Sequence, residues 1–448
     1  MRLIFSVFAA CLFFYAQPLF AIDAPLNSER AAIDLLMARA ISQNLIAGGI
    51  AVIGNRNGIL SITAKGRLNA SEDSPLINEH TLFDVASLTK VIATAPAVMK
   101  LLEEGRITLT DPLTRWFPEF KNSGRDGITI LNLLTHTSGL QDIMLHSGDT
   151  IRTTIQKIAG QKYRGNSFRY ADINFILLGE LVNRVSGKTL DAFCHDQLYA
   201  PLGAQETMFL PPHTLSDMIA PTTGINKGIV QDLNARRLGG VAGHAGLFSS
   251  ASDLAKFARL IMGGGMIDGN RILSEQIVTQ MTAPYFCGSG TVRRGLGWDI
   301  NSPFSAPRGN FFSETSFGHT GYSGSSIWID PQRDLFVILL TVRLNYRDTG
   351  LFNQLRRDVS TVAATEFKNL DEYQGLPLLA GAARASSDLI RIETSNLVKH
   401  TPSRATKQIA QFNKKKHHLK YAQQRFNKKD KRMAKNTGTN RTSGRVRS

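Results

Sequence analysis

Apolar residues recur at helical spacing over residues 28–47, and two short apolar runs then flank Asn57-Gly58. Apolar positions three or four residues apart indicate an amphipathic helix, whereas two apolar runs around an Asn-Gly pair indicate a β-hairpin. These patterns predict a helix followed by hairpin strands at 49–53 and 59–62.

A second hairpin is predicted near the other end of the apolar pattern. Residues 325–329 and 335–341 are apolar and β-branched, and the turn-forming run 330–334 separates them. A helical pattern follows from about residue 350 to 367. Because strands occur on both sides of a long middle region, we expect one sheet assembled from distant pieces of the chain.

The middle region carries the period of helices rather than that of strands. Helical patterns cover 91–104, 128–134, 174–186 and 252–262. Ser250 stands three residues before Asp253, which is typical of a capping pair at a helix start. The middle of the chain is therefore predicted to be a mostly helical insertion.

Together these elements predict an α+β fold. An antiparallel sheet would be flanked by N- and C-terminal helices, and a mostly helical lobe of about residues 90–300 would be inserted between the sheet segments. With 42% hydrophobic and 20% charged residues, the chain can bury a large core. We expect residues 22–370 to form one folded unit of two lobes, with its cleft at their junction.

The first 21 residues have the composition of a secretory signal peptide. Met1-Arg2 precedes an apolar run over 3–16, and the segment ends in a small residue, Ala21. The run is shorter than the roughly 20 residues that span a bilayer, which disfavours a membrane anchor. It also continues past Cys11, which disfavours a lipid-attachment box, and no later stretch is long and apolar enough to span. We expect an exported protein, periplasmic or secreted after cleavage.

The positive charge is concentrated at the end of the chain. Of the net charge of +16, residues 401–448 contribute +14 from 15 Lys and Arg against Asp430, so the rest is nearly neutral. Few apolar residues interrupt this region, and we predict a disordered basic tail over 371–448. It would bind anionic envelope polymers or a membrane surface, or serve only as a solvated tail. Nucleic acid is not an expected partner of an exported protein.

The cysteines and histidines do not suggest a metal centre. Cys194 and Cys287 are the two cysteines beyond the leader, and we favour separate buried thiols over a disulfide between them. The histidines stand singly, without the paired spacings of zinc sites. No metal and no other cofactor is expected.

Ser87-Leu88-Thr89-Lys90 is the first candidate for catalytic chemistry. A helix that begins near Ala86 would place the Ser87 hydroxyl and the Lys90 amine on one face. A serine needs an adjacent base to become a nucleophile, and a desolvated lysine can lose its proton and serve. Unpaired N–H groups at the helix start can stabilise a developing oxyanion. The motif alone arises by chance about once in a chain of this length, so its neighbours must decide.

Four further blocks accompany this motif. In chain order, the five blocks are 83–94, 128–140, Tyr170-Ala171-Asp172, 243–250 and His319-Thr320-Gly321. They occur in the order seen in the serine β-lactamase and penicillin-binding-protein-like family, and the chain resembles the branch with class C β-lactamases, D,D-carboxypeptidases and related esterases. The resemblance covers about residues 30–368 and implies the fold more firmly than the substrate.

The resemblance implies roles for individual residues. Ser87 would be acylated, Lys90 would activate it, and Tyr170 would shuttle the proton between nucleophile and leaving group. A phenol beside an ammonium group favours its anionic form, so we expect Tyr170 to act as a base well below its ordinary pKa of about 10. By the same resemblance, backbone N–H groups of Ser87 and Tyr322 would form an oxyanion hole, with Gly321 allowing the strand edge to approach a ligand.

Two residues depart from the commonest family pattern. His319 replaces the lysine of Lys-Thr-Gly, and a histidine with an ordinary pKa near 6.5 is mostly neutral at pH 7, which weakens recognition of a substrate carboxylate. If a charged His319 did bind that carboxylate, KM would rise between about pH 5 and 8. Asp172 replaces the amide of Tyr-x-Asn and cannot donate a hydrogen bond. We expect Asp172 to pair with Lys90 instead, which would leave Tyr170 as the better base.

Other residues of the recurring blocks are assigned structural roles. His136, Ser138, His244 and Trp298 are expected to shape loops and line the cleft.

The sequence therefore predicts an exported serine hydrolase that forms an acyl-enzyme on Ser87. Its substrates would be peptidoglycan-type D-Ala peptides or β-lactams. One alternative is an esterase of the same fold that acts on small esters, and another is a catalytically inactive envelope-binding protein. The residues expected to hold the substrate are His319, Thr320, Gly321, Tyr322 and Asp172.

Overall fold

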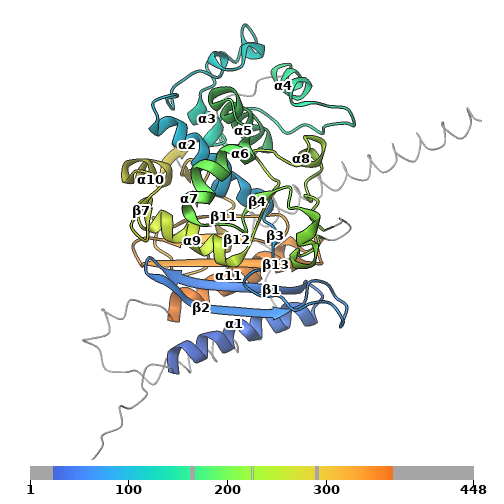
Figure 1. Ribbon diagram of the computed structural model, residues 1–448. Helices are drawn as coiled ribbons and strands as arrows, with labels where there is room; N and C mark the ends of the chain where they lie inside the picture. The colour runs from blue at the N-terminus through green and yellow to red at the C-terminus, as the bar shows by residue number, and fades with distance from the viewer. Residues whose placement is uncertain (1–23, 162–166, 223–224, 226, 288–291, 367–448) are drawn as a thin grey trace, which may run out of the picture. The chain divides into compact units, whose positions relative to one another are not determined.

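An antiparallel sheet assembled from both ends of the folded region is the base of the molecule (Figure 1). The computed structural model describes residues 24–161, 167–222, 225, 227–287 and 292–366. Within them, eight strands lie in the order β2-β1-β13-β12-β11-β10-β9-β8. Their bounds are β1 Ile46–Asn55, β2 Gly58–Gly66, β8 Tyr285–Cys287, β9 Val292–Arg294, β10 Asp299–Asn301, β11 Phe317–Thr320, β12 Ser326–Asp330 and β13 Leu335–Arg343.

The two predicted hairpins and their union into one sheet are confirmed. In the first hairpin Asn55 lies opposite Gly58, and the Asn55 side chain accepts hydrogen bonds from the N–H groups of Asn57 and Gly58. In the second, Asp330 of β12 lies opposite Leu335 of β13. β1 then pairs with β13, which joins two segments that are distant in sequence.

Alternate residues of the central strands face two different hydrophobic cores. Ala51 and Ile53 of β1 pack with α1 (Ala24–Ser42) and α11 (Thr349–Glu366), whereas Ile50 and Val52 pack with the helical part of the chain. This follows from the two-residue period of a strand, and burial on both faces explains why the strands read as continuous apolar runs. Figure 1 shows α1 below the sheet and α2, α5 and α6 above it.

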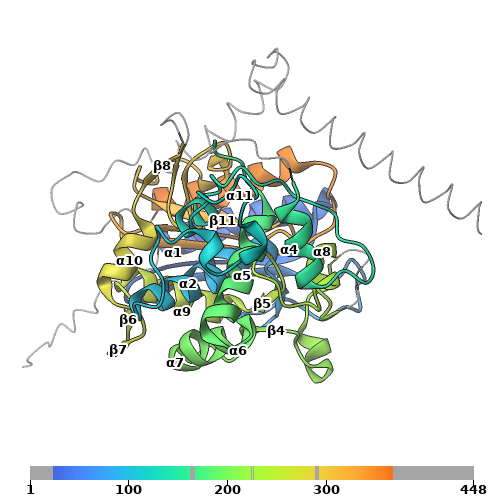
Figure 2. The same cartoon turned by 90° about the horizontal axis from the view of Figure 1, so that it is seen from above.

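The helical part lies between the sheet segments in sequence. Its helices are α2 Ala95–Glu103, α3 Ile130–Leu134, α4 Ile151–Ala159, α5 Asp172–Ser186, α6 Leu190–Cys194, α7 Ala200–Leu202, α8 Leu233–Arg237, α9 Ala251–Met262 and α10 Glu275–Thr282. Seen from above, α5 lies between α2 and α4 (Figure 2). Its side chains are buried along most of its length, as in Phe175, Leu178 and Leu181. The predicted α+β class is confirmed.

Among the described residues, two small sheets accompany the eight-stranded sheet. β3 (Phe83–Asp84), β5 (Leu247–Ser249) and β4 (Met208–Phe209) form one of them, and β6 (Met266–Ile267) pairs with β7 (Asn270–Arg271) in the other. In the first, Asp84 lies opposite Phe248. This pairing brings the segment before Ser87 next to the segment that follows His244.

Several sequence predictions concern residues that the structure does not describe. The signal peptide over 1–21 and the basic tail over 371–448 both lie outside the described residues. Across the ranges given above, helices lack the length and apolar composition needed to cross a membrane. Cys194 and Cys287 are buried and unbonded to each other, which confirms the interpretation as separate thiols.

Candidate active site

Ser87 lies on a sharp turn between a strand and a helix. β3 ends at Asp84, a short 3-10 turn covers Ala86–Leu88, and a wider helical turn over Lys90–Thr94 leads into α2. Ala86 has φ +48°, a left-handed conformation that costs energy for a residue with a side chain. The Asp84 carboxylate accepts a hydrogen bond from Ala86 N–H at 2.9 Å, and Thr89 Oγ1 donates to the Ala86 carbonyl at 2.6 Å. Both polar groups of the strained residue are thus held.

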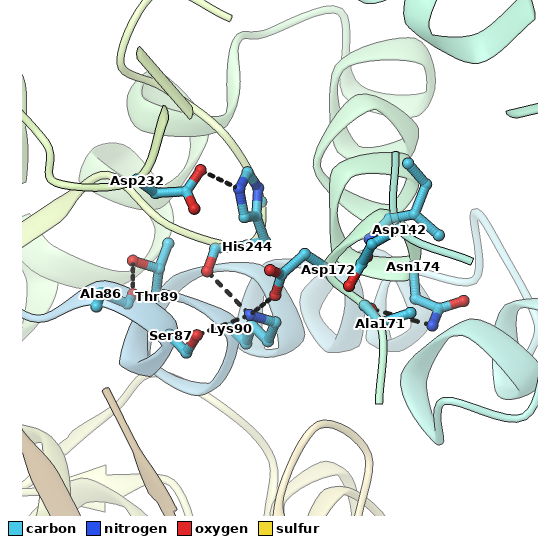
Figure 3. A network of polar contacts seen from close by, with 12 residues as sticks. Ala86, Ser87, Thr89, Lys90, Asp142, Ala171, Asp172, Asn174, Asp232 and His244 are labelled. Carbon is cyan, nitrogen blue, oxygen red and sulfur yellow. Dashed lines mark hydrogen bonds and ion pairs between the residues drawn. The ribbon is translucent and has the colours of Figure 1, made fainter. Parts of the chain in front are cut away.

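Lys90 lies directly beside Ser87, as its spacing predicts (Figure 3). Its Nζ is 3.1 Å from Ser87 Oγ, 3.1 Å from the His244 carbonyl oxygen and 2.8 Å from Asp172 Oδ1. The lysine side chain is fully buried, whereas the Asp172 side chain is 34% exposed. The expected pairing of Lys90 with Asp172 is therefore confirmed.

This ion pair decides the protonation state of Lys90. Burial alone would lower the pKa of Lys90, but the nearby Asp172 and Tyr170 raise it above the ordinary value. Burial would likewise raise the pKa of Asp172, but Lys90 lowers it. Lys90 is thus an ammonium group paired with a carboxylate. This agrees with the expected effect of the Asp172 pairing, and not with the alternative that desolvation lets Lys90 lose its proton.

Tyr170 completes the cluster around the nucleophile. Its phenol group lies near Ser87 and Lys90, which both act on its pKa, and Lys90 Nζ lies 5.2 Å from the centre of the phenol ring. The ring stacks on His136 with centroids 4.5 Å apart. His136 Nδ1 accepts a hydrogen bond from Ala171 N–H at 3.3 Å, so the imidazole supports the segment that carries Tyr170.

The pKa of Tyr170 differs from the sequence expectation. Burial raises the pKa of Tyr170 above its ordinary value of 10, and this outweighs the lowering effect of the Lys90 charge. The phenol is therefore neutral in the resting site. The sequence argument counted the ammonium group but not the loss of water, which only the folded structure reveals.

The segment after β11 packs against the nucleophile turn. Ser323 Oγ donates to the Asp84 carbonyl at 2.5 Å, and Ser325 Oγ donates to the Val85 carbonyl at 2.8 Å. At Gly321 a Cβ would lie 2.1 Å from Ser325 Oγ and 2.4 Å from the Val85 carbonyl oxygen, so only glycine fits. The next residue, Tyr322, is 47% exposed.

Arg356 of α11 fixes this segment from behind. Its Nη2 donates to the carbonyl oxygens of Gly321 and Ser325, at 2.5 and 2.9 Å. The guanidinium group is buried, and burial together with the charge of Arg343 lowers its pKa to about 9. The Arg356 cation therefore holds the loop, and its charge is directed at backbone carbonyl oxygens.

His319 is buried, and the next residue, Thr320, is half-buried. Its Nδ1 donates to the Thr320 carbonyl at 2.9 Å, and its ring centre lies 5.9 Å from that of Tyr170. Burial, with the charges of Lys90 and Arg294, lowers the pKa of His319 well below 6.5. A neutral His319 cannot give the rise in KM between about pH 5 and 8 that a charged imidazole would produce.

The structure also brings together acids that the sequence analysis left apart. His244 Nε2 and Asp232 Oδ1 are 2.8 Å apart, and one ligand atom each of Asp172, Asp232 and His244 lies within 4.8 Å of the others (Figure 3). Such a set has donors for a cation, but the Lys90 ammonium already pairs with Asp172 and would repel one. Asp232 caps the start of α8 and His244 lies 12 residues after it, beyond that helix, and such a spacing gives no sequence signal.

Two further carboxyl groups escaped the sequence analysis. Asp84 Oδ2 accepts a hydrogen bond from Gln231 N–H at 2.7 Å, so one buried side chain ties the Ser87 turn to the loop of Asp232. Burial raises the pKa of Asp84 to about 6. Burial and the charge of Asp172 likewise raise the pKa of Asp142 to about 6. The sequence offered one sign of the role of Asp84, which is that this acid interrupts the apolar run before Ser87.

The residues assigned structural roles lie in supporting positions. Ser138 Oγ donates to Asn174 Oδ1 at 2.5 Å, and that amide lies 3.2 Å from His136 Nδ1. Trp298 is fully buried and packs edge-on against Phe317 of β11 at 5.2 Å. These contacts support the strand and the helix that carry the site.

Comparisons with known proteins show which proteins the chain resembles as a whole. The family model described as Beta-lactamase matches residues 37–359. A Salmonella agona (strain SL483) protein to which D-alanyl-D-alanine carboxypeptidase activity is ascribed is 27% identical over 59% of this chain and 70% of its own.

Solved structures share the fold at low sequence identity. EstCE1, a hydrolase with promiscuous acyltransferase activity, is 22% identical with a TM-score of 0.62 over 75% of this chain and 98% of its own. A penicillin-binding-protein homologue from Caulobacter crescentus is 20% identical with a TM-score of 0.63 over 75% of this chain and 97% of its own.

Proposed function

Since this chain belongs to the Beta-lactamase family of serine hydrolases, we propose that it hydrolyses its substrate through an acyl-enzyme on Ser87. The observation that carries the proposal is the position of Ser87, whose Oγ lies 3.1 Å from Lys90 Nζ and which also lies beside the Tyr170 phenol. A serine with two such neighbours on a strained turn has the surroundings of an activated nucleophile.

In the acylation step, Ser87 Oγ forms a bond to the substrate carbonyl carbon. The Tyr170 oxygen takes the Ser87 proton while the Tyr170 proton passes to the leaving atom, whose bond to the carbonyl carbon breaks. This exchange suits a neutral phenol, since Tyr170 ends the step as it began. The Lys90 ammonium stabilises the negative charge that builds up on the Tyr170 oxygen, and Asp172 keeps Lys90 protonated.

Water completes the cycle by the same exchange in reverse. A water molecule attacks the acyl carbonyl carbon and gives its proton to Tyr170, while the Tyr170 proton returns to Ser87 Oγ as the ester bond breaks. The backbone N–H groups of Ser87 and Tyr322 would hold the oxyanion in both steps. Loss of one such donor costs roughly 10²- to 10³-fold in rate, so the contacts of Ser323, Ser325 and Arg356 that fix the Tyr322 segment support catalysis.

Three substrate classes fit this chemistry. The Salmonella agona relative favours D-Ala peptides, and the family also supports β-lactams. Small uncharged esters are favoured by the charges around Ser87, because His319 is neutral while Asp172 and Asp232 are 34% and 33% exposed. Partly exposed carboxylates disfavour a substrate carboxylate nearby and do not affect a neutral ester. Export to the periplasm or medium is part of the same proposal.

Covalent labelling tests the nucleophile. The full chain should become labelled by a fluorophosphonate, with one adduct per chain by intact mass, and Ser87→Ala should abolish the label. Ser71→Ala, at an exposed serine, is the matched control and should label like the parent. If a fluorescent β-lactam and the fluorophosphonate both fail to label Ser87, the inactive binding protein becomes the better reading.

Turnover of three substrates separates the candidate activities. We expect kcat/KM to be higher for p-nitrophenyl acetate than for nitrocefin or a D-Ala-D-Ala peptide, because both of these carry a carboxylate. A D-Ala-D-Ala peptide as the best substrate would instead support the carboxypeptidase and contradict the charge argument.

A further inference from the structure

An exposed aromatic ring lies next to the tyrosine of the candidate site. The Phe304 side chain is 47% exposed, and its ring centre lies 5.3 Å from that of Tyr170 and 6.3 Å from that of Phe168. A single exposed phenyl is ordinary on a protein surface. This one continues an aromatic surface that begins at Tyr170, which lies beside Ser87.

The loop that carries Phe304 is held by a chain of hydrogen bonds. Phe304 N–H donates to Ser302 Oγ at 3.0 Å, and Ser302 N–H donates to Ser305 Oγ at 2.8 Å. Ser305 Oγ donates to Asp299 Oδ2 at 3.1 Å, and Asp299 Oδ1 accepts from buried Arg294 at 3.2 Å. The turn is therefore anchored to a buried ion pair at the edge of the sheet.

The same ion pair also supports the second ring. The Arg294 guanidinium carbon lies 5.4 Å from the centre of the Phe168 ring, and Arg294 itself is fully buried. Phe168 and Phe304 belong to segments distant in sequence, yet one arginine positions both. Because the two rings are held in place before a ligand binds, little entropy is lost in ordering them on binding.

Resting on the proposed function, we propose that Phe304 and Phe168 form a subsite for an aryl or alkyl group on the leaving alcohol of an uncharged ester. Tyr170 donates its proton to the leaving atom, so the atoms bonded to that leaving atom lie beside Tyr170. Phe304 packs on the Tyr170 ring, which assigns the subsite to the leaving-group side of the bond that breaks.

The charges of the site agree with an uncharged substrate. His319 is neutral, and Arg294 is already paired with Asp299. Asp172, which is partly exposed, pairs with Lys90 beside the nucleophile. An apolar leaving group would gain contact with two rings in addition to the area that it buries.

Three esters locate the subsite. Ethyl acetate is the reference, 2-phenylethyl acetate carries a phenyl group on the alcohol, and ethyl 3-phenylpropanoate carries one on the acyl side. We expect kcat/KM for 2-phenylethyl acetate to exceed that for ethyl acetate by about tenfold. Phe304→Ala should remove most of this preference, whereas Phe304→Tyr, which keeps the ring, should retain it.

Phe311→Ala is the matched control. Phe311 is 48% exposed, on the loop before β11, and its removal should leave the preference for 2-phenylethyl acetate as it is in the parent. An equal loss in the Phe311 variant, or an unchanged preference in Phe304→Ala, would overturn the subsite. A higher kcat/KM for ethyl 3-phenylpropanoate than for 2-phenylethyl acetate would contradict the assignment of the subsite to the leaving group.

The labelling of Ser87 keeps this test separate from that of the proposed function. An enzyme that is acylated on Ser87 but shows no preference among the esters has the proposed function without the subsite. A chain that is never acylated on Ser87 loses both.

Discussion

Asp172 determines the electrostatics of the candidate site at the scale of single residues. An amide in this position would leave Lys90 free to lose its proton in a buried environment, because burial disfavours the ammonium form. The carboxylate reverses this balance and holds Lys90 charged. In the proposed mechanism this choice of side chain leaves Tyr170, rather than Lys90, as the group that transfers the proton.

Asp84 gives a prediction about stability and pH. Burial raises the pKa of Asp84 from 3.8 to about 6, the N–H groups of Gln231 and Ala86 partly oppose this, and Asp232 adds to it. Because the folded protein holds this proton more tightly than the unfolded chain, the group's contribution to stability is fully present below about pH 4. That contribution is lost as the pH rises through about 6, when a buried charge must form.

Asp84→Asn should therefore change the pH dependence of stability. The difference in the free energy of unfolding, variant minus parent, should rise by about 3 kcal/mol between pH 4 and 7, since two pKa units correspond to that amount. Urea unfolding of both proteins at several pH values measures it. A constant difference across this range would contradict a raised pKa, whatever the effect of the lost acceptor for Ala86 or Gln231.

At the scale of elements, short strands and helix starts position the site more than the long helices do. β3 and β5 pair for only two residues, yet this pairing brings the Ser87 turn beside the loop of His244. α9 begins directly after β5, so the start of α9 fixes where that loop ends. Its first turn is capped by Ser250, whose side chain accepts a hydrogen bond from Asp253 N–H at 3.2 Å.

Removal of this cap should destabilise the protein measurably. Ser250→Ala should lower the free energy of unfolding by about 1 kcal/mol, because a buried N–H group at the helix start loses its acceptor. Ser252→Ala, at a half-buried serine in the same helix, is the control and should change stability by less than about 0.5 kcal/mol. Equal effects of the two changes in urea unfolding would contradict the capping role.

At the scale of the whole molecule, the described residues and the basic tail have different charge. We propose that the tail binds anionic envelope polymers or membrane surfaces, since residues 401–448 carry +14 of the net charge. The full chain should bind vesicles that contain phosphatidylglycerol at low salt and leave them as salt rises, because screening weakens such contacts.

A chain that ends at His400 is the comparison for this proposal. It should show little vesicle binding while Ser87 is labelled as in the full chain, because the active-site contacts described above lie before residue 367. Equal vesicle binding by the two chains would remove the proposed role of the tail.

The sequence by itself determined the features that depend on near neighbours. Helical spacing placed Lys90 against Ser87, strand patterns on both sides of a helical region indicated one sheet, and the identity of Asp172 led to its pairing with Lys90. Each follows from local geometry or from a choice between a carboxylate and an amide. The substrate was not determined, because the same blocks serve several activities.

Tertiary structure alone decided the features that depend on burial and on distant contacts. It raised the pKa of Tyr170, lowered that of His319 and placed Phe304 on the Tyr170 ring. The physical reason is that the desolvation of a side chain leaves no periodic pattern in the sequence. A charge and its partner can be read from residue types, but the water that each group loses depends on every segment that packs around it.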